Sequence, residues 1–114
     1  MYNFIEHIKL FDGASLAGSL TSDPIKLKTA SRFSIHLVLT GAPSGTFKVQ
    51  ASNIPTAEGA AVADWADIAY SSIVISNANS VFYNVSDAGY YYARVVYTRT
   101  SGTGTVTGHV VIKG

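Results

Sequence analysis

The sequence predicts an all-β protein whose short antiparallel strands form a sandwich or barrel. Apolar and polar residues alternate with a period of two along much of the chain, a pattern typical of half-buried strands. Turn residues recur roughly every 8 to 12 residues and divide the chain into about eight such segments. The 114 residues suit one domain, so we expect residues 1–114 to form a single β-sandwich.

The clearest strands are predicted at Arg32–Thr40 and Thr46–Ser52, where the alternation is nearly unbroken. The turn between them, Gly41–Gly45, contains a proline and two glycines, which end one strand and begin another. We therefore expect these two strands to pair as a hairpin. The residues expected to face the core are Phe33, Ile35, Leu37, Leu39, Phe47, Val49 and Ala51.

The remaining strands follow from weaker alternation bounded by turn signals. Residues 53–66 break the pattern, because they are rich in alanine and contain Pro55 and Gly59, so we expect a long loop there. Gly102–Gly104 is interpreted as a hairpin turn before the last strand. The other expected strands are Phe4–Phe11, Ile25–Lys28, Ile68–Ile75, Ser80–Val85, Tyr90–Thr100 and Thr105–Ile112.

The strand expected at Tyr90–Thr100 is unusual, because it contains four of the seven tyrosines and two of the three arginines. One interpretation is a central strand with aromatic rings packed on both faces and Arg94 neutralised by an acid such as Asp67 or Asp87. The other is an aromatic and arginine face for stacking on a sugar or contacting a protein partner. The face that includes Val95 and Tyr97 is expected to join the core.

Composition excludes several classes of function. Without cysteine the chain is neither a disulfide scaffold nor a CxxC zinc protein, and a net charge of +1 gives no basic excess for nucleic acid. No run approaches the roughly 18 apolar residues of a membrane helix, and the first residues do not predict a signal peptide. Charged residues make up only 13%, so we expect a neutral surface rich in Ser, Thr, Asn, Gly and Tyr, as on extracellular, carbohydrate-facing or particle-bound proteins.

No catalytic set or cofactor site can be identified, so neither an enzyme nor a cofactor is expected. His7, His36 and His109 are far apart in sequence and are interpreted as surface or cross-strand histidines, although the fold could assemble them into a metal site. The aspartates are expected in turns as acceptors of backbone hydrogen bonds, with a loop calcium site as the alternative. They are Asp12, Asp23, Asp64, Asp67 and Asp87.

The segments Gly45–Asn53, Phe82–Tyr97 and Thr100–Thr105, with a loop ending near Trp65 between the first two, resemble a small β-sandwich of bacteriophage virion proteins. They are also distantly similar to the jelly-roll of discoidin-type carbohydrate-binding domains. The resemblance covers residues 33–114 and departs from the pattern after Asn53, where this chain has a longer alanine-rich excursion. It implies a jelly-roll-like sandwich and a structural or adhesive virion protein without catalysis.

Two functions follow as expectations. The first is a non-enzymatic bacteriophage virion protein, located in the virion as a capsid decoration or cement protein, head fibre or tail component. Its partners would be capsid or tail proteins and further copies of itself, with a trimer expected first. The alternative is a discoidin-like carbohydrate-binding module that binds a surface glycan. For either, the expected binding residues are Trp65, Asp64, Asp67, Tyr90, Tyr92 and Arg94. The alternative for Trp65 is a structural role in which its ring closes one end of the core.

Overall fold

The computed structural model describes residues 5–27, 32–53, 65–69, 71–76, 80–85 and 90–113, which form ten strands and no helix. Accordingly, these residues include no helix that could span a membrane. The strands are β1 (Ile5–Ser15), β2 (Leu20–Thr21), β3 (Ile25–Lys26), β4 (Arg32–Gly41), β5 (Ser44–Ser52), β6 (Ala66–Asp67), β7 (Ile73–Ser76), β8 (Ser80–Val85), β9 (Tyr92–Ser101) and β10 (Gly104–Lys113).

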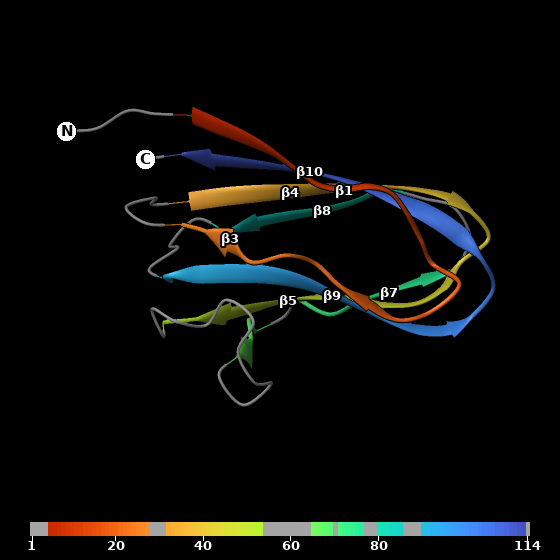
Figure 1. Cartoon of the computed structure of the whole chain (residues 1–114). Helices are drawn as coiled ribbons and strands as arrows, with labels where there is room; N and C mark the ends of the chain where they lie inside the picture. The colour runs from red at the N-terminus through yellow and green to blue at the C-terminus, as the bar shows by residue number, and fades with distance from the viewer. Residues whose placement is uncertain are drawn as a thin grey trace.

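The strands form two antiparallel sheets that pack face to face as a sandwich (Figure 1). The four-stranded sheet has the order β1-β10-β4-β8. The six-stranded sheet has the order β2-β9-β5-β6, with β3 also paired to β9 and β7 also paired to β5. The predicted all-β antiparallel sandwich is confirmed.

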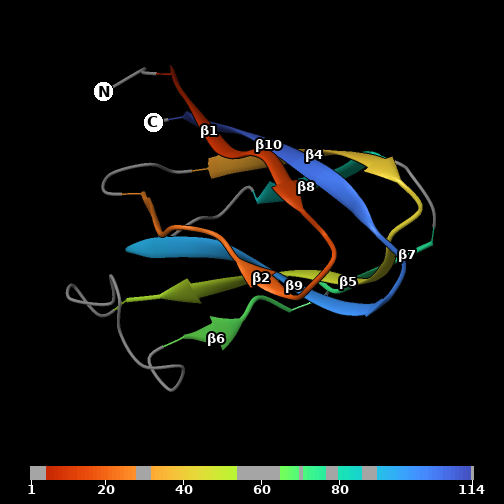
Figure 2. The ribbon, with the colours of Figure 1, turned by 45° about the vertical axis from the view of Figure 1, so that its right-hand side comes forward.

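Two positions in the six-stranded sheet are each filled by a pair of very short strands. β2 and β3 pair with successive parts of β9, and β6 and β7 pair with different parts of β5 (Figure 2). Counting each pair as one interrupted strand leaves eight strand positions, divided equally between the two sheets. Successive positions then alternate between the sheets except at β5 and β6/β7, which share the six-stranded sheet, and this is the double Greek-key order of a jelly-roll.

Both expected hairpins are wrong. β4 and β5 are consecutive but belong to opposite sheets, and the same holds for β9 and β10. The two connections cross the sandwich side by side at one end, where the Ala42 amide donates to the Thr103 carbonyl over 2.9 Å (Figure 1). Gly41 and Gly102 have φ of +80° and +77°, a conformation that glycine adopts without strain. The same turn residues that favour a hairpin therefore form corners between sheets.

The strand predicted at Ile68–Ile75 is also wrong in its extent. The chain pairs with β5 at Ala66–Asp67, the Ile68 amide still donates to the Val49 carbonyl at 2.9 Å, and among the described residues pairing resumes at Ile73. In the gap, the Ser71 hydroxyl accepts from the Val49 amide at 3.1 Å and lies 2.7 Å from the Ile68 carbonyl oxygen. A serine side chain thus satisfies a backbone group of β5 that a continuous neighbouring strand would have satisfied.

The core lies between the sheets and contains the residues that the alternation assigned to it, except Tyr91, which shares a face with Val95 and Tyr97 but is 44% exposed. Phe33, Ile35, Leu37 and Leu39 of β4 are buried, as are Phe47, Val49 and Ala51 of β5, which confirms the period-two interpretation. The expected inner face of β9 is buried through Ala93, Val95 and Tyr97. Tyr97 packs on Phe47 with ring centroids 4.6 Å apart.

The expectation of a tyrosine-rich exterior is wrong for most described tyrosines. Tyr83, Tyr92 and Tyr97 are buried, Tyr90 is half-buried, and only Tyr91 is exposed. Aromatic rings gain most by packing between or against the sheets, since each can bury a large apolar area. Within the described ranges, the exposed large hydrophobic residues are Val38, Val74, Phe82 and Tyr91.

Candidate binding surface on the six-stranded sheet

The candidate site is built on the outer face of β5, β6 and β9. Because side chains alternate along a strand, burying Val49 and Val95 in the core places Gln50 and Arg94 on the opposite face. The register aligns Gln50 with Arg94 on one side and with Asp67 on the other. Three strands that are distant in sequence therefore bring one amide, one guanidinium and one carboxylate into a single row.

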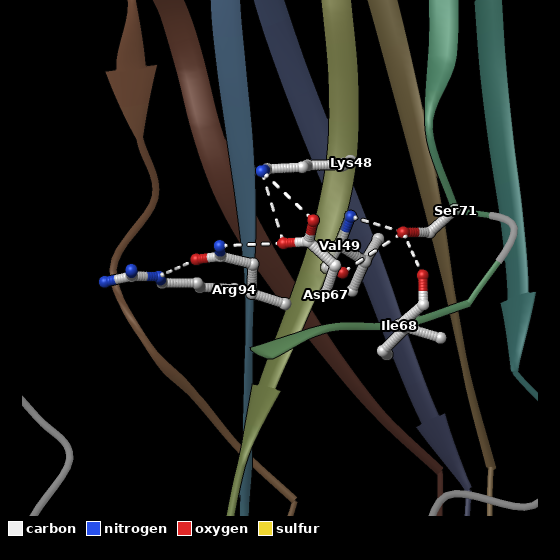
Figure 3. A network of polar contacts seen from close by, with 7 residues as sticks. Lys48, Val49, Asp67, Ile68, Ser71 and Arg94 are labelled. Carbon is white, nitrogen blue, oxygen red and sulfur yellow. Dashed lines mark hydrogen bonds and ion pairs between the residues drawn. The ribbon is translucent and has the colours of Figure 1, made fainter. Parts of the chain in front are cut away.

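These groups form a chain of polar contacts across the sheet (Figure 3). Arg94 Nε donates to Gln50 Oε1 at 2.9 Å, and Gln50 Nε2 donates to Asp67 Oδ1 at 2.9 Å. Lys48 Nζ lies 3.2 Å from the same carboxylate oxygen. Arg94 therefore reaches Asp67 through Gln50, rather than through the direct ion pair suggested by the sequence; Asp87 lies outside the described residues.

The electrostatic state of Asp67 follows from these contacts. The hydrogen bond from Gln50 is the largest influence, and together with the contact from Lys48 it holds the pKa of the Asp67 carboxyl below its ordinary value of 3.8. Partial burial lowers the pKa of Arg94, which remains a cation at neutral pH. The Asp67 carboxylate therefore lies between two cations. Lys48 contacts it directly, and Arg94 is linked to it through the neutral Gln50 amide.

Trp65 packs at the end of this row, outside the main core. The guanidinium carbon of Arg94 lies 4.3 Å from the centroid of the Trp65 ring, and Tyr92 packs beside that ring at 6.4 Å. Only 6% of Trp65 and 4% of Tyr92 is exposed, and the two form a small cluster of their own. The indole Nε1 is buried with no hydrogen-bond partner among the described residues.

A hollow of about 330 Å³ opens beside the tryptophan. Its rim includes the Asn53 amide, whose oxygen accepts a hydrogen bond from the Tyr91 backbone amide at 3.1 Å. Both apolar and polar residues line it. The residues lining the hollow are Ala51, Ser52, Asn53, Trp65, Ala66, Asp67, Ile68, Ala69 and Tyr90.

Five of the six binding residues that the sequence predicted lie in the described ranges. Trp65, Asp67, Tyr92 and Arg94 come together on the outer face, and Tyr90 lines the adjacent hollow. Asp64 lies outside the described residues, as does most of the expected loop. Whether these side chains bind a partner stays a prediction.

Gln50 is the residue of this surface that sequence reasoning missed. The alternation placed it on the outer face, but its role depends on Asp67, which is 17 residues away and belongs to a strand that was not predicted. A polar residue between two core positions gives no signal of its pairing partner. Only the register of β5 against β6 and β9 supplied that information.

Within the described ranges, no three or more His, Asp or Glu side chains are grouped so that they could hold a metal ion. Asp12 and Asp67, expected in turns, lie instead in β1 and β6 and contact Lys9 and Lys48 respectively.

We expect Gln50→Leu to raise the pKa of Asp67 towards its ordinary value, because the largest influence on that carboxyl is the Gln50 hydrogen bond. Since the folded-state pKa is depressed, Asp67 stabilises the fold above its unfolded pKa, and this contribution is lost as the pH falls through the folded value. The variant should therefore lose less stability on acidification. Carboxyl-carbon NMR titration measures the change, and Lys48→Met, which removes a hydrogen bond and a positive charge, should also raise the pKa of Asp67. An unchanged Asp67 pKa in Gln50→Leu would contradict this assignment.

The fold has counterparts among solved structures, although neither a protein-family model nor a curated protein sequence matches the chain. The SPBc2 prophage-derived protein YomS superimposes with a TM-score of 0.61 at 14% identity, covering 97% of this chain and 96% of that one. A chain of infectious bursal disease virus, Gx strain, gives 0.55 at 11% identity over 97% of this chain but 32% of its own length. These similarities establish a shared fold.

A carbohydrate-active protein has a similar fold as well. The CBM22-1–GH10 modules of Clostridium thermocellum endo-1,4-beta-D-xylanase 10B, complexed with xylohexaose, give a TM-score of 0.51 at 6% identity. The match covers 96% of this chain and 26% of that one. The jelly-roll sandwich is thus shared with viral and glycan-related proteins, so the fold alone does not select between the two expected functions.

Proposed function

We propose that this chain is a non-enzymatic structural protein of a bacteriophage virion, acting as a capsid decoration or cement protein, a head fibre or a tail component. The observation that supports this most is the end-to-end correspondence with a prophage-derived protein, in which the same sandwich accounts for nearly the whole of both chains. Jelly-rolls are a recurrent architecture of viral capsid proteins.

The surface supports a role in assembly. Phe82 and Val74 are 65% and 80% exposed, so both apolar side chains are accessible to a partner. They lie on different sheets, so the sandwich can make contacts on two sides. The proposed partners are capsid or tail proteins of the same virion and further copies of the chain, with a trimer as the first expectation.

The candidate binding surface is the proposed docking element on the six-stranded sheet. The Trp65 and Tyr92 rings are covered, so a partner would meet the rim: the exposed Asp67 carboxylate, the half-buried Lys48 side chain and the exposed Tyr91 ring, which packs on Tyr92 with centroids 4.8 Å apart. Buried Trp65 and Tyr92, together with half-buried Arg94, would hold this rim in place. Pre-organised polar groups of this kind favour specificity more than affinity.

The carbohydrate-binding alternative is supported by the similarity to the xylanase modules. Sugar stacking, however, requires an open aromatic face, and both Trp65 and Tyr92 are almost fully buried. Among the described residues of this surface, that leaves Tyr91, 44% exposed, and half-buried Tyr90 for stacking. The geometry of the described residues therefore favours a protein partner.

The proposal predicts that the native protein co-sediments with virus particles. Lysates of the source phage would be separated on a density gradient, and the fractions probed with an antibody raised against the purified chain. We expect the signal in the particle band, in fixed stoichiometry to the major capsid protein. A signal confined to the particle-free fractions, combined with saturable binding to a glycan array, would overturn the virion assignment in favour of the alternative.

Sedimentation velocity of the purified chain tests the oligomer separately. We expect a concentration-dependent assembly, with a trimer as the defined end state. A strict monomer at high concentration that also fails to bind particles would contradict the proposed partners.

A further inference from the structure

All three histidines of the chain lie on the outer face of the four-stranded sheet, on the side of the molecule away from the candidate binding surface. The register places Lys9 of β1, His109 of β10, His36 of β4 and Phe82 of β8 directly opposite one another in one row. His7 precedes Lys9 by two residues on β1 and is therefore the diagonal neighbour of His109. The fold has assembled residues separated by up to 102 positions.

His7 and His109 form a close pair. Their Nε2 and Nδ1 atoms are 3.2 Å apart, whereas their ring centroids are 5.3 Å apart with an interplanar angle of 22°. Since the nitrogens are much closer than the centroids and the rings are nearly parallel, the rings meet edge to edge, with the two nitrogens between them. One imidazole must then donate N–H to the lone pair of the other.

A metal ion can replace the shared proton in such a pair. Zinc binds imidazole nitrogen at about 2.0–2.1 Å, so two imidazoles on one tetrahedral ion have nitrogens roughly 3.3 Å apart. The separation of 3.2 Å already matches this requirement, and the exposed edge strand β1 lets the His7 ring tilt towards an ion. We propose that His7 and His109 chelate a divalent transition metal of the zinc, nickel or copper class, for which imidazole is a preferred ligand.

The neighbouring residues define the limits of this site. His36 stacks on Phe82 with centroids 4.4 Å apart and an interplanar angle of 13°, which engages its ring with β8 rather than with the pair. Lys9 is beside His109, but its ammonium is 3.5 Å from the Asp12 carboxylate, which offsets part of its charge. The described residues supply two ligands, and water or the matching pair of a second copy would complete the coordination.

Isothermal titration calorimetry of the untagged protein with zinc, nickel or copper chloride tests the proposal, with magnesium chloride as the control ion. We expect saturable binding of the transition metals at one ion per chain, or one per two chains if a second copy completes the site. Magnesium should not bind, because it prefers oxygen ligands. Acidification should weaken binding, because protons compete for imidazole nitrogen.

Single variants locate the site. His7→Gln and His109→Gln should each weaken zinc binding by at least about tenfold. Loss of a group that only orients a metal ligand already lowers metal affinity by about 10- to 100-fold, and here a ligand itself is lost. His36→Gln is the matched control from the same face and should bind like the native chain. Imidazole NMR of the native chain provides a second readout, in which zinc should shift His7 and His109 more than His36. Absence of saturable binding, or equal loss in His36→Gln, would overturn the proposal.

Discussion

We expect Leu37→Asp to leave the chain unfolded under conditions in which the native chain is folded. Leu37 is fully buried at the centre of β4, between Val81 of β8 and Gly108 of β10. A side chain at Gly108 would lie only 3.2 Å from Leu37 Cδ2, so the leucine packs tightly over that glycine. A carboxylate at this position would have neither water nor a cation, at a cost of several kcal/mol.

That cost is on the order of the whole stability of a small domain, about 5–15 kcal/mol. Urea unfolding followed by circular dichroism measures it. The matched control is Val38→Asp, the same kind of substitution one residue further along the strand. Val38 is 38% exposed on the outer face, so its replacement should cost about 1 kcal/mol or less. Similar unfolding midpoints for the two variants would refute the assignment of the inner face of β4.

The second large effect is expected from Gly102→Ala, at the corner where the chain crosses from β9 to β10. Gly102 has a φ of +77°, which costs an L-residue about 1–2 kcal/mol. An added Cβ would also collide with the Ala42 carbonyl oxygen and lie 3.2 Å from its carbon, so the adjacent crossing would have to move. Together these effects should destabilise the fold by about 3 kcal/mol or more.

Gly13→Ala separates the two causes. Gly13 also has a positive φ, +63°, but nothing lies within 4 Å of the position of its added Cβ. It should therefore show the conformational cost alone, about 1–2 kcal/mol. Thermal melting of the two variants provides the comparison. If Gly102→Ala costs no more than Gly13→Ala, then contact between the two corners does not contribute to the stability of the sandwich.

The candidate surface could be predicted only in part. The aromatic and arginine residues of β9 and the lone tryptophan drew attention because of their residue types, and the fold brings Trp65, Tyr92 and Arg94 together. The sequence could not show that Arg94 covers the Trp65 ring or that Gln50 connects Arg94 to Asp67. These contacts depend on which strands are neighbours, and strand pairing joins residues far apart in the chain.

The sequence by itself determined which side chains face the core, because the period of two is a local property of a strand. It placed Phe33, Leu37 and Val49 inside without reference to any partner strand. Only the tertiary structure decided that the glycine turns cross between sheets, and that His7 meets His109. A turn has the same local chemistry in a hairpin and at a corner, so the choice depends on burying two apolar faces against each other, to which the whole chain contributes.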